Sequence, residues 1–163
     1  MRKNLEIVAL VVFGISLWIT YGAFYGPHRL PERIATHFGA DGRPNGWGSP
    51  TMLLMLPVIV LAVYGLMTLV AQFPSTFNYP VRVTAENRAR LEELSLQMIS
   101  WLKVEIVCLF TFIQWFIIQS ARQGTLTMSP LVVPLCIATI FATVGWHIVA
   151  MIRTAAPRAV DRR

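Results

Sequence analysis

The sequence predicts an all-α protein: a four-helix transmembrane bundle with a structured outer loop and a long third helix that extends into the cytoplasm. Two observations predict this fold class. The 163 residues are 55% hydrophobic and only 13% charged, whereas a soluble domain is about 45–50% apolar and about 25% charged. The apolar residues also form four runs, each near the roughly 20 residues that a helix needs to cross a bilayer core. This composition disfavours a soluble enzyme and a disordered tail.

The four apolar runs cover residues 5–25, 51–73, 101–119 and 130–152, and together they make residues 1–163 a single membrane domain. Charged or ionisable side chains inside them are few: Glu6, Lys103, Glu105 and His147. The first run is longer than the 7–15 apolar residues of a secretion signal, and it ends in bulky side chains instead of a small-x-small cleavage site. We therefore expect an uncleaved first helix.

The placement of the basic residues predicts the orientation. Ten of the 14 Lys and Arg residues, Lys103 among them, flank the amino end, the second loop and the carboxyl end, and four lie in the first and third loops. Because cytoplasmic segments carry the excess of Lys and Arg, we expect both termini in the cytoplasm. The net charge of +6 thus reports topology, and we expect no nucleic-acid partner.

The first loop, residues 26–50, is rich in turn-forming residues. Asp41-Gly42 and Pro44-Asn45-Gly46 favour tight turns, because Gly tolerates positive φ and Pro presets its own φ. A short apolar stretch from Ile34 to Phe38 precedes them. We expect this loop to fold against the outer membrane face.

The same loop carries a family resemblance. The pattern Leu30-Pro31-x-x-Ile34-x-Thr36-His37-Phe38-x-x-x-Gly42-x-Pro44-x-Gly46-Trp47, just after a first membrane helix, resembles the signature of the domain of unknown function 1648 (DUF1648). The family usually has a proline before Thr-His-Phe, where this chain has Ala35. The second loop, Phe77-Asn78-Tyr79-Pro80-Val81-x-x-Thr84-x-x-Asn87, is similar to the segment that follows the second span in small family members.

The resemblance implies a bacterial inner-membrane protein related to the Sdp-type immunity proteins. On this basis we expect a non-enzymatic protein of the immunity or signalling type, whose outer loop senses an envelope peptide or lipid. The candidate binding residues are those of the loop signature: Pro31, Glu32, Thr36, His37, Phe38, Gly42 and Trp47. The alternatives are a small proton-coupled transporter or permease component, and a membrane metal hydrolase.

The loop histidines His28 and His37 are weak candidates for a metal site. They lie nine residues apart, which matches no compact ligand motif. His37 can equally hydrogen-bond the loop and fix a turn, or bind a peptide or lipid headgroup. We expect no cofactor.

Glu105 and His147 form a candidate intramembrane polar pair. Ionisable groups inside a membrane are costly and are therefore functional candidates. A rise of 1.5 Å per residue places Glu105 about 6 Å and His147 about 7.5 Å inside the same membrane face, on antiparallel helices. The competing expectation is that Glu105 extends to the interface together with Lys103.

The second loop begins a long helix, since no Gly or Pro occurs in residues 85–119. Thr84 is the expected N-cap. The first part is amphipathic, with Leu91, Leu94 and Met98 on one face. This segment is expected either to lie on lipid headgroups or to dock a cytoplasmic regulator; the oligomeric state is open.

Overall fold

The predicted fold class is confirmed by the computed structural model, which describes residues 1–27, 29–124 and 127–154. In chain order the elements are α1 (Arg2–Tyr25), β1 (Ile34–Phe38), β2 (Pro44–Gly48), η1 (Pro50–Leu54), α2 (Met55–Val70), η2 (Pro74–Thr76), α3 (Arg88–Gln123) and α4 (Val132–Arg153). α1, α3, α4 and the segment from η1 through α2 are each long and apolar enough to cross a membrane. The chain thus fits a multi-pass integral membrane protein.

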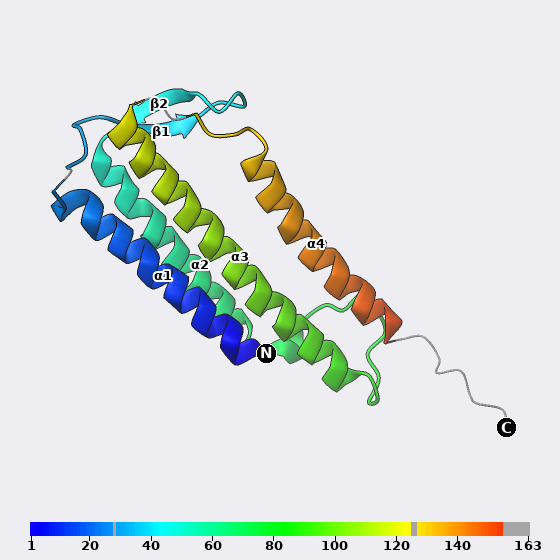
Figure 1. Ribbon diagram of the computed structural model, residues 1–163. Helices are drawn as coiled ribbons and strands as arrows, with labels where there is room; N and C mark the ends of the chain where they lie inside the picture. The colour runs from blue at the N-terminus through cyan, green and yellow to red at the C-terminus, as the bar shows by residue number, and fades with distance from the viewer. Residues whose placement is uncertain (28, 125–126, 155–163) are drawn as a thin grey trace.

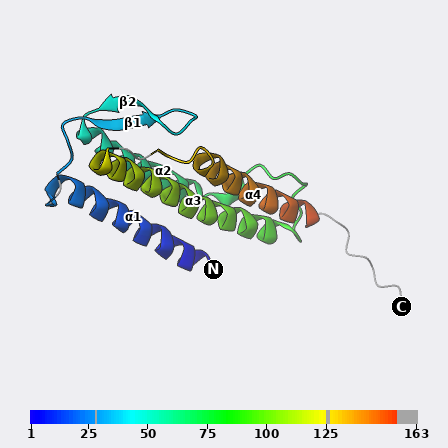
Figure 2. The same cartoon turned by 45° about the horizontal axis from the view of Figure 1, so that its top comes forward.

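α3 is the central helix of the bundle and packs against α1, α2 and α4. α1 lies on one side of it and α4 on the other (Figures 1 and 2). The two-stranded hairpin covers one end of the bundle, which we call the hairpin end (Figure 1). The start of α1 and the end of α4 lie at the opposite end, the N-terminal end, as an even number of antiparallel helices requires.

Three small apolar clusters hold the helices together along the bundle. The cluster at the hairpin end contains Ala23, Ile34, Leu53, Ile117 and Ile118. The middle cluster contains Ala9, Val60 and Val107, and the cluster at the N-terminal end contains Leu91, Leu94 and Met151. Many other large apolar side chains point outward, such as Trp18 at 74% and Phe141 at 71% exposed. Apolar surface of this extent on all sides is typical of helices that face lipid.

The long third helix begins at Arg88, three residues after the start that an N-cap at Thr84 would give. Residues 85–87 form a turn, and Asn87 is the N-cap of α3. The Thr84 amide donates to Asn87 Oδ1 at 2.8 Å, and the Asn87 amide donates to Thr84 Oγ1 at 3.4 Å. This reciprocal pair closes a turn before the helix starts, so Thr84 caps that turn and α3 runs from Arg88 to Gln123. Gly124, with φ +74°, ends it.

Candidate functional site

The predicted structured loop is an antiparallel β-hairpin. Ile34 pairs with Gly48 and Phe38 with Pro44, with register irregularities on either side of His37. The tip is shaped by the Asp41-Gly42 turn: Gly42 has φ +75°, and the Asp41 carboxylate accepts the Arg43 amide at 3.0 Å. The backbone amide of Gly39 also donates to the Arg43 carbonyl at 2.8 Å. The turn signals in the sequence therefore mark the tip of a hairpin.

Apolar side chains of β1 dock the hairpin onto the bundle. Ile34 and Ala35 are buried, and Ile34 packs in the hairpin-end cluster. The Phe38 ring meets the Phe116 ring of α3 edge-on, with centroids 5.2 Å apart. The hairpin is thus held over the C-terminal end of α3.

The tip of the hairpin also contacts the segment before α4. The Met128 amide donates to the Gly42 carbonyl at 3.0 Å. A Cβ on Gly42 would collide with the Met128 backbone, so glycine is required here for space as well as for its φ. This contact ties the first loop to the entrance of the fourth helix.

Between the hairpin, α3 and the start of α4 lies a cavity of about 420 Å³. We call it the hairpin cavity. Its polar side chains are Thr36, His37 and Ser129, and all three come from the hairpin and the α3–α4 connection. Its other walls are apolar or glycine: Phe38, Gly39, Ala40, Gly42, Ile113, Ile117, Met128, Pro130, Val133 and Pro134. The cavity is polar at its hairpin side and apolar toward the bundle.

The structure brings four of the seven signature residues together around the hairpin cavity: Thr36, His37, Phe38 and Gly42. Pro31 and Glu32 are exposed on the chain that leads into β1. Trp47 is 55% exposed, at the position of β2 opposite Ala35. The signature therefore contains both cavity residues and exposed residues.

His37 takes part in a hydrogen bond within the hairpin, between its Nδ1 and Asn45 Oδ1 on β2. This bond joins the side chains of two strands, and a role of His37 in fixing a turn or in binding a ligand stays a prediction. His28 lies outside the described residues. Within residues 1–27, 29–124 and 127–154, no group of three or more His, Cys, Asp or Glu side chains is placed to hold a metal ion.

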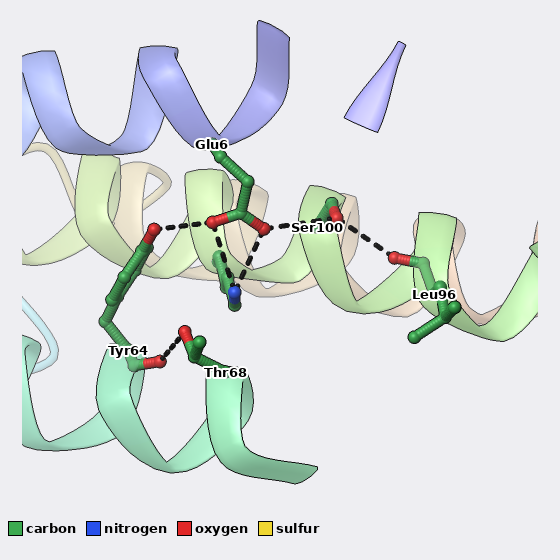
Figure 3. Close-up of polar contacts among 6 residues, drawn as sticks. Glu6, Tyr64, Thr68, Leu96 and Ser100 are labelled. Atoms are coloured by element: carbon green, nitrogen blue, oxygen red, sulfur yellow. Dashed lines mark hydrogen bonds and ion pairs between the residues drawn. The ribbon is translucent and has the colours of Figure 1, made fainter. Parts of the chain in front are cut away.

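An ion pair between the buried Lys103 of α3 and the partly exposed Glu6 of α1 connects three helices. Lys103 Nζ contacts the two carboxylate oxygens of Glu6 at 2.9 and 3.1 Å. The same carboxylate accepts the Tyr64 hydroxyl at 2.5 Å and the Ser100 hydroxyl at 3.3 Å (Figure 3). Lys103 is 3% exposed and lies 4.6 Å from the centroid of the Tyr64 ring. The ammonium group is thus enclosed by α1, α2 and α3.

The Glu6–Lys103 pair corrects the prediction that Lys103 extends to the interface with Glu105. Residues two apart on a helix face different directions, and Lys103 faces α1 while Glu105 faces α4. Sequence reasoning missed the pair. The signal that could have found it is the occurrence of opposite charges near the same membrane face on two neighbouring spans.

A second buried polar network lies nearer the hairpin end. Ser16 Oγ donates to Gln114 Oε1 at 2.5 Å, Gln114 Nε2 donates to the Thr20 hydroxyl, and Thr20 Oγ1 donates to the Ser16 carbonyl at 2.8 Å. Gln114 is completely buried. These bonds join α1 to α3, as polar side chains do between helices in membranes.

Glu105 and His147 are brought to the same residue of α4, Thr143, and are linked through it. The Thr143 hydroxyl donates to Glu105 Oε1 at 2.5 Å, and His147 Nδ1 lies 2.8 Å from the Thr143 carbonyl oxygen. Thr143 is at the middle of α4 (Val132–Arg153). Glu105 therefore lies opposite the centre of α4.

The face proposed for a cytoplasmic partner is already covered by the chain itself. Leu91 is completely buried and Leu94 is 4% exposed, packed with Met151 and with residues of the second loop. Met98 lines a cavity of about 660 Å³ between that loop, α3 and α4. The amphipathic stripe is therefore internal, and the charged side with Arg88 and Arg90 is the exposed one.

The comparison with protein families confirms the resemblance seen in the loop. The family described as Domain of unknown function (DUF1648) matches residues 7–61. This match covers about a third of the chain, so residues 7–61 are similar to DUF1648. The match takes in most of α1, the whole hairpin and the beginning of α2, and so it includes the signature residues at the hairpin cavity.

A curated relative is similar over part of the chain. It is an uncharacterized protein of Archaeoglobus fulgidus, 33% identical over 85 residues. The match covers 47% of this chain and 43% of the relative, so the chain spans less than half of that protein's length. No solved structure gives a significant match.

Proposed function

We propose that this protein is a non-enzymatic membrane sensor that binds an amphiphile, a lipid or an apolar peptide with a polar end, in the hairpin cavity. The observation that carries the proposal is the composition of this cavity. About 420 Å³ is within the usual range of ligand pockets, about 300–1,000 Å³, which are mostly apolar with a few polar groups that fix orientation.

The two sides of the hairpin cavity suit the two parts of an amphiphile. Thr36, His37 and Ser129 offer hydroxyl and imidazole groups, which in the predicted orientation lie near the outer interface, where a polar end would lie. Ile113 and Val133 lie on the helices and can contact an apolar chain. A ligand that already sits in the bilayer would place its polar and apolar parts at these depths without leaving the membrane.

The central helix offers a route for a response. α3 lines the hairpin cavity through Ile113 and Ile117, and it continues without a break to Arg88 at the N-terminal end. In the predicted orientation, the exposed Arg88 and Arg90 face the cytoplasm. A cytoplasmic regulator would therefore contact this charged side, since Leu91 and Leu94 are internal.

Binding to the purified protein tests the proposal. A fluorescent lysophospholipid is titrated into wild type, Val133→Trp and Leu135→Trp in detergent micelles. Val133 lines the cavity, whereas Leu135, two residues along the same helix, is 63% exposed. We expect Val133→Trp to weaken binding roughly tenfold, a change of about 1.4 kcal/mol, and Leu135→Trp to bind as wild type. Equal binding by all three proteins would reject the hairpin cavity as the site.

The immunity role is tested in cells. A deletion strain is compared with wild type for growth in the presence of envelope-active peptides, and is complemented with wild type or His37→Ala. Increased sensitivity of the deletion strain, restored by wild type and restored less by His37→Ala, is the expected result. If deletion leaves sensitivity unchanged, the protein has no immunity role against those peptides.

A further inference from the structure

We propose that Glu105 is a proton-binding site inside the membrane, at the centre of the seam between α3 and α4. This inference goes beyond ligand binding in the hairpin cavity and does not depend on it. It begins from one atom: Glu105 Oε2 is buried and has no hydrogen-bond partner, while Oε1 accepts the Thr143 hydroxyl at 2.5 Å. A carboxylate oxygen left without a donor in an apolar environment is costly, because nothing replaces the hydration it has lost.

The surroundings of Glu105 favour a proton over a metal ion as its occupant. Cation sites combine several oxygen ligands, whereas the Thr143 hydroxyl uses its hydrogen toward Glu105. Within the part of the chain that the structure describes, no cluster of three acidic, His or Cys side chains occurs. Binding one proton converts the carboxylate into a neutral acid and needs no further ligand.

Other titratable groups lie around Glu105 on both sides of α3. Cys108 lies three residues from Glu105 on its own helix. His147 lies one turn after Thr143 on α4, and its Nδ1 contacts the Thr143 carbonyl oxygen. On the other side of α3, Lys103 is held by Glu6 and lies over Tyr64. Because Lys103 is already paired, His147 is the ionisable group of the seam best placed to exchange a proton toward Glu105.

A cavity lies toward each end of the seam. The hairpin cavity reaches Ile113 and Val133 at one end. The 660 Å³ cavity reaches Ile99 and Ile148 at the other, and Ile148 is the neighbour of His147. Glu105 and Thr143 lie between these two cavities along both helices and line neither of them.

The test is an infrared titration of the protein in lipid nanodiscs. Acidification produces a carboxylic-acid C=O absorption from each carboxyl group that it protonates, and we expect the contribution of one buried group in wild type that is missing in Glu105→Gln. The matched control Glu93→Gln, at the N-terminal end of the same helix, is expected to retain it. Glu105→Asp keeps a carboxyl group and is expected to shift the absorption without removing it, which separates loss of the site from loss of the fold.

Two results would overturn the proposal. One is a wild-type titration spectrum in Glu105→Gln. The other is loss of the absorption in Glu6→Gln with its retention in Glu105→Gln, which would assign the proton to the ion pair. Lysophospholipid binding by Glu105→Gln is measured in parallel and is expected to equal that of wild type, so failure of this proposal and failure of the ligand proposal are distinguishable.

Discussion

A single buried lysine shows how this small bundle is held together. Moving an ammonium group out of water costs several kcal/mol, and the bundle offsets this with two contacts to Glu6 and the face of Tyr64. The Glu6 carboxylate in turn has donors from α2 and α3. Glu6, Lys103, Tyr64 and Ser100 therefore form one unit. Removal of either charged member, Glu6 or Lys103, leaves the other charge without its partner.

Replacing Lys103 by Met is expected to lower the free energy of unfolding by about 3 kcal/mol, because Glu6 loses its counter-charge inside the bundle. Lys3→Met, at an exposed position of α1, is the control and should change it by less than about 0.5 kcal/mol. Denaturant unfolding in micelles measures both. The double variant Glu6→Gln/Lys103→Met should recover part of the loss; a double variant less stable than Lys103→Met would contradict the pairing.

Gly42 is the glycine with the most demanding position. Gly42→Ala places a Cβ against the Met128 backbone at φ +75°, and it should lower the unfolding free energy by about 2 kcal/mol through strain and lost docking. Gly14→Ala is the matched control, since a Cβ there meets nothing within 4 Å. It should be neutral or slightly stabilising, because Ala favours helix over Gly. Thermal unfolding compares the two, and equal effects would show that the tip does not depend on this contact.

Residue types at the site could be predicted from the sequence, whereas their partners could not. Glu105 and His147 are candidates because ionisable groups are rare inside the apolar runs, and His37 is a candidate because it lies in the loop signature. Their contacts depend on helix rotation and on strand register. The rotation of α3 about its axis that turns Lys103 toward α1 also turns Glu105 toward α4. The apolar runs contain no strong periodicity from which this rotation could be predicted.

At the scale of elements, the hairpin connects the outer loop to the bundle through β1. Phe38→Ala removes the ring that packs on Phe116 and is expected to lower the unfolding free energy by about 3 kcal/mol. Trp47→Ala, at an exposed position of β2, should cost less than about 0.5 kcal/mol. The comparison is made by thermal unfolding. A larger effect of Trp47→Ala would mean that the hairpin is held by its other face.

The second loop is tied down by Tyr79, whose hydroxyl donates to the Pro74 carbonyl at 2.7 Å. Burial raises the pKa of Tyr79, and the Glu92 carboxylate adds to this. A raised pKa means that the folded protein favours the neutral Tyr79 phenol over the phenolate more than the unfolded chain does. The contribution to stability is therefore full below the unfolded value of about 10 and is lost as pH rises through the folded pKa.

We expect the stability of wild type to fall above about pH 10 more steeply than that of Tyr79→Phe. At neutral pH Tyr79→Phe should be less stable by about 1 kcal/mol, because it lacks the hydrogen bond. Unfolding at a series of pH values, together with the absorbance of tyrosinate, measures both effects. Parallel pH profiles would contradict a raised pKa at this position.

The helices could be predicted because length and apolarity alone decide whether a segment spans a membrane. The strands could not, since β2 reads Pro44-Asn45-Gly46-Trp47-Gly48, a composition typical of a loop. It pairs because β1 is anchored by Ile34 and the tip turn fixes the register. The sequence predicts the apolar stripe with Leu91 but not its cover, because part of that cover, Ala150 and Met151 of α4, is distant in sequence.

At the scale of the whole molecule, the arrangement around α3 separates the candidate sites by position and by direction. The hairpin cavity lies at one end of α3, whereas Glu105 faces α4 and Lys103 faces Glu6 of α1 from nearly the same level of the helix. The burial of Lys103 removes one of the ten basic residues that predicted the orientation, but the excess on that side remains. The hairpin end is therefore still expected to be the outer end.

The central claim is that the hairpin cavity binds an amphiphile, and photo-crosslinking tests it most directly. A lysophospholipid with a photoreactive apolar chain is bound to wild-type protein, irradiated, and its adducts are mapped by mass spectrometry. The account predicts adducts concentrated on cavity residues such as Ile113 and Val133, reduced by excess unlabelled lysophospholipid and by Val133→Trp. Adducts spread evenly over the outward faces of α1, α2 and α4, unchanged by competitor or by Val133→Trp, would contradict it.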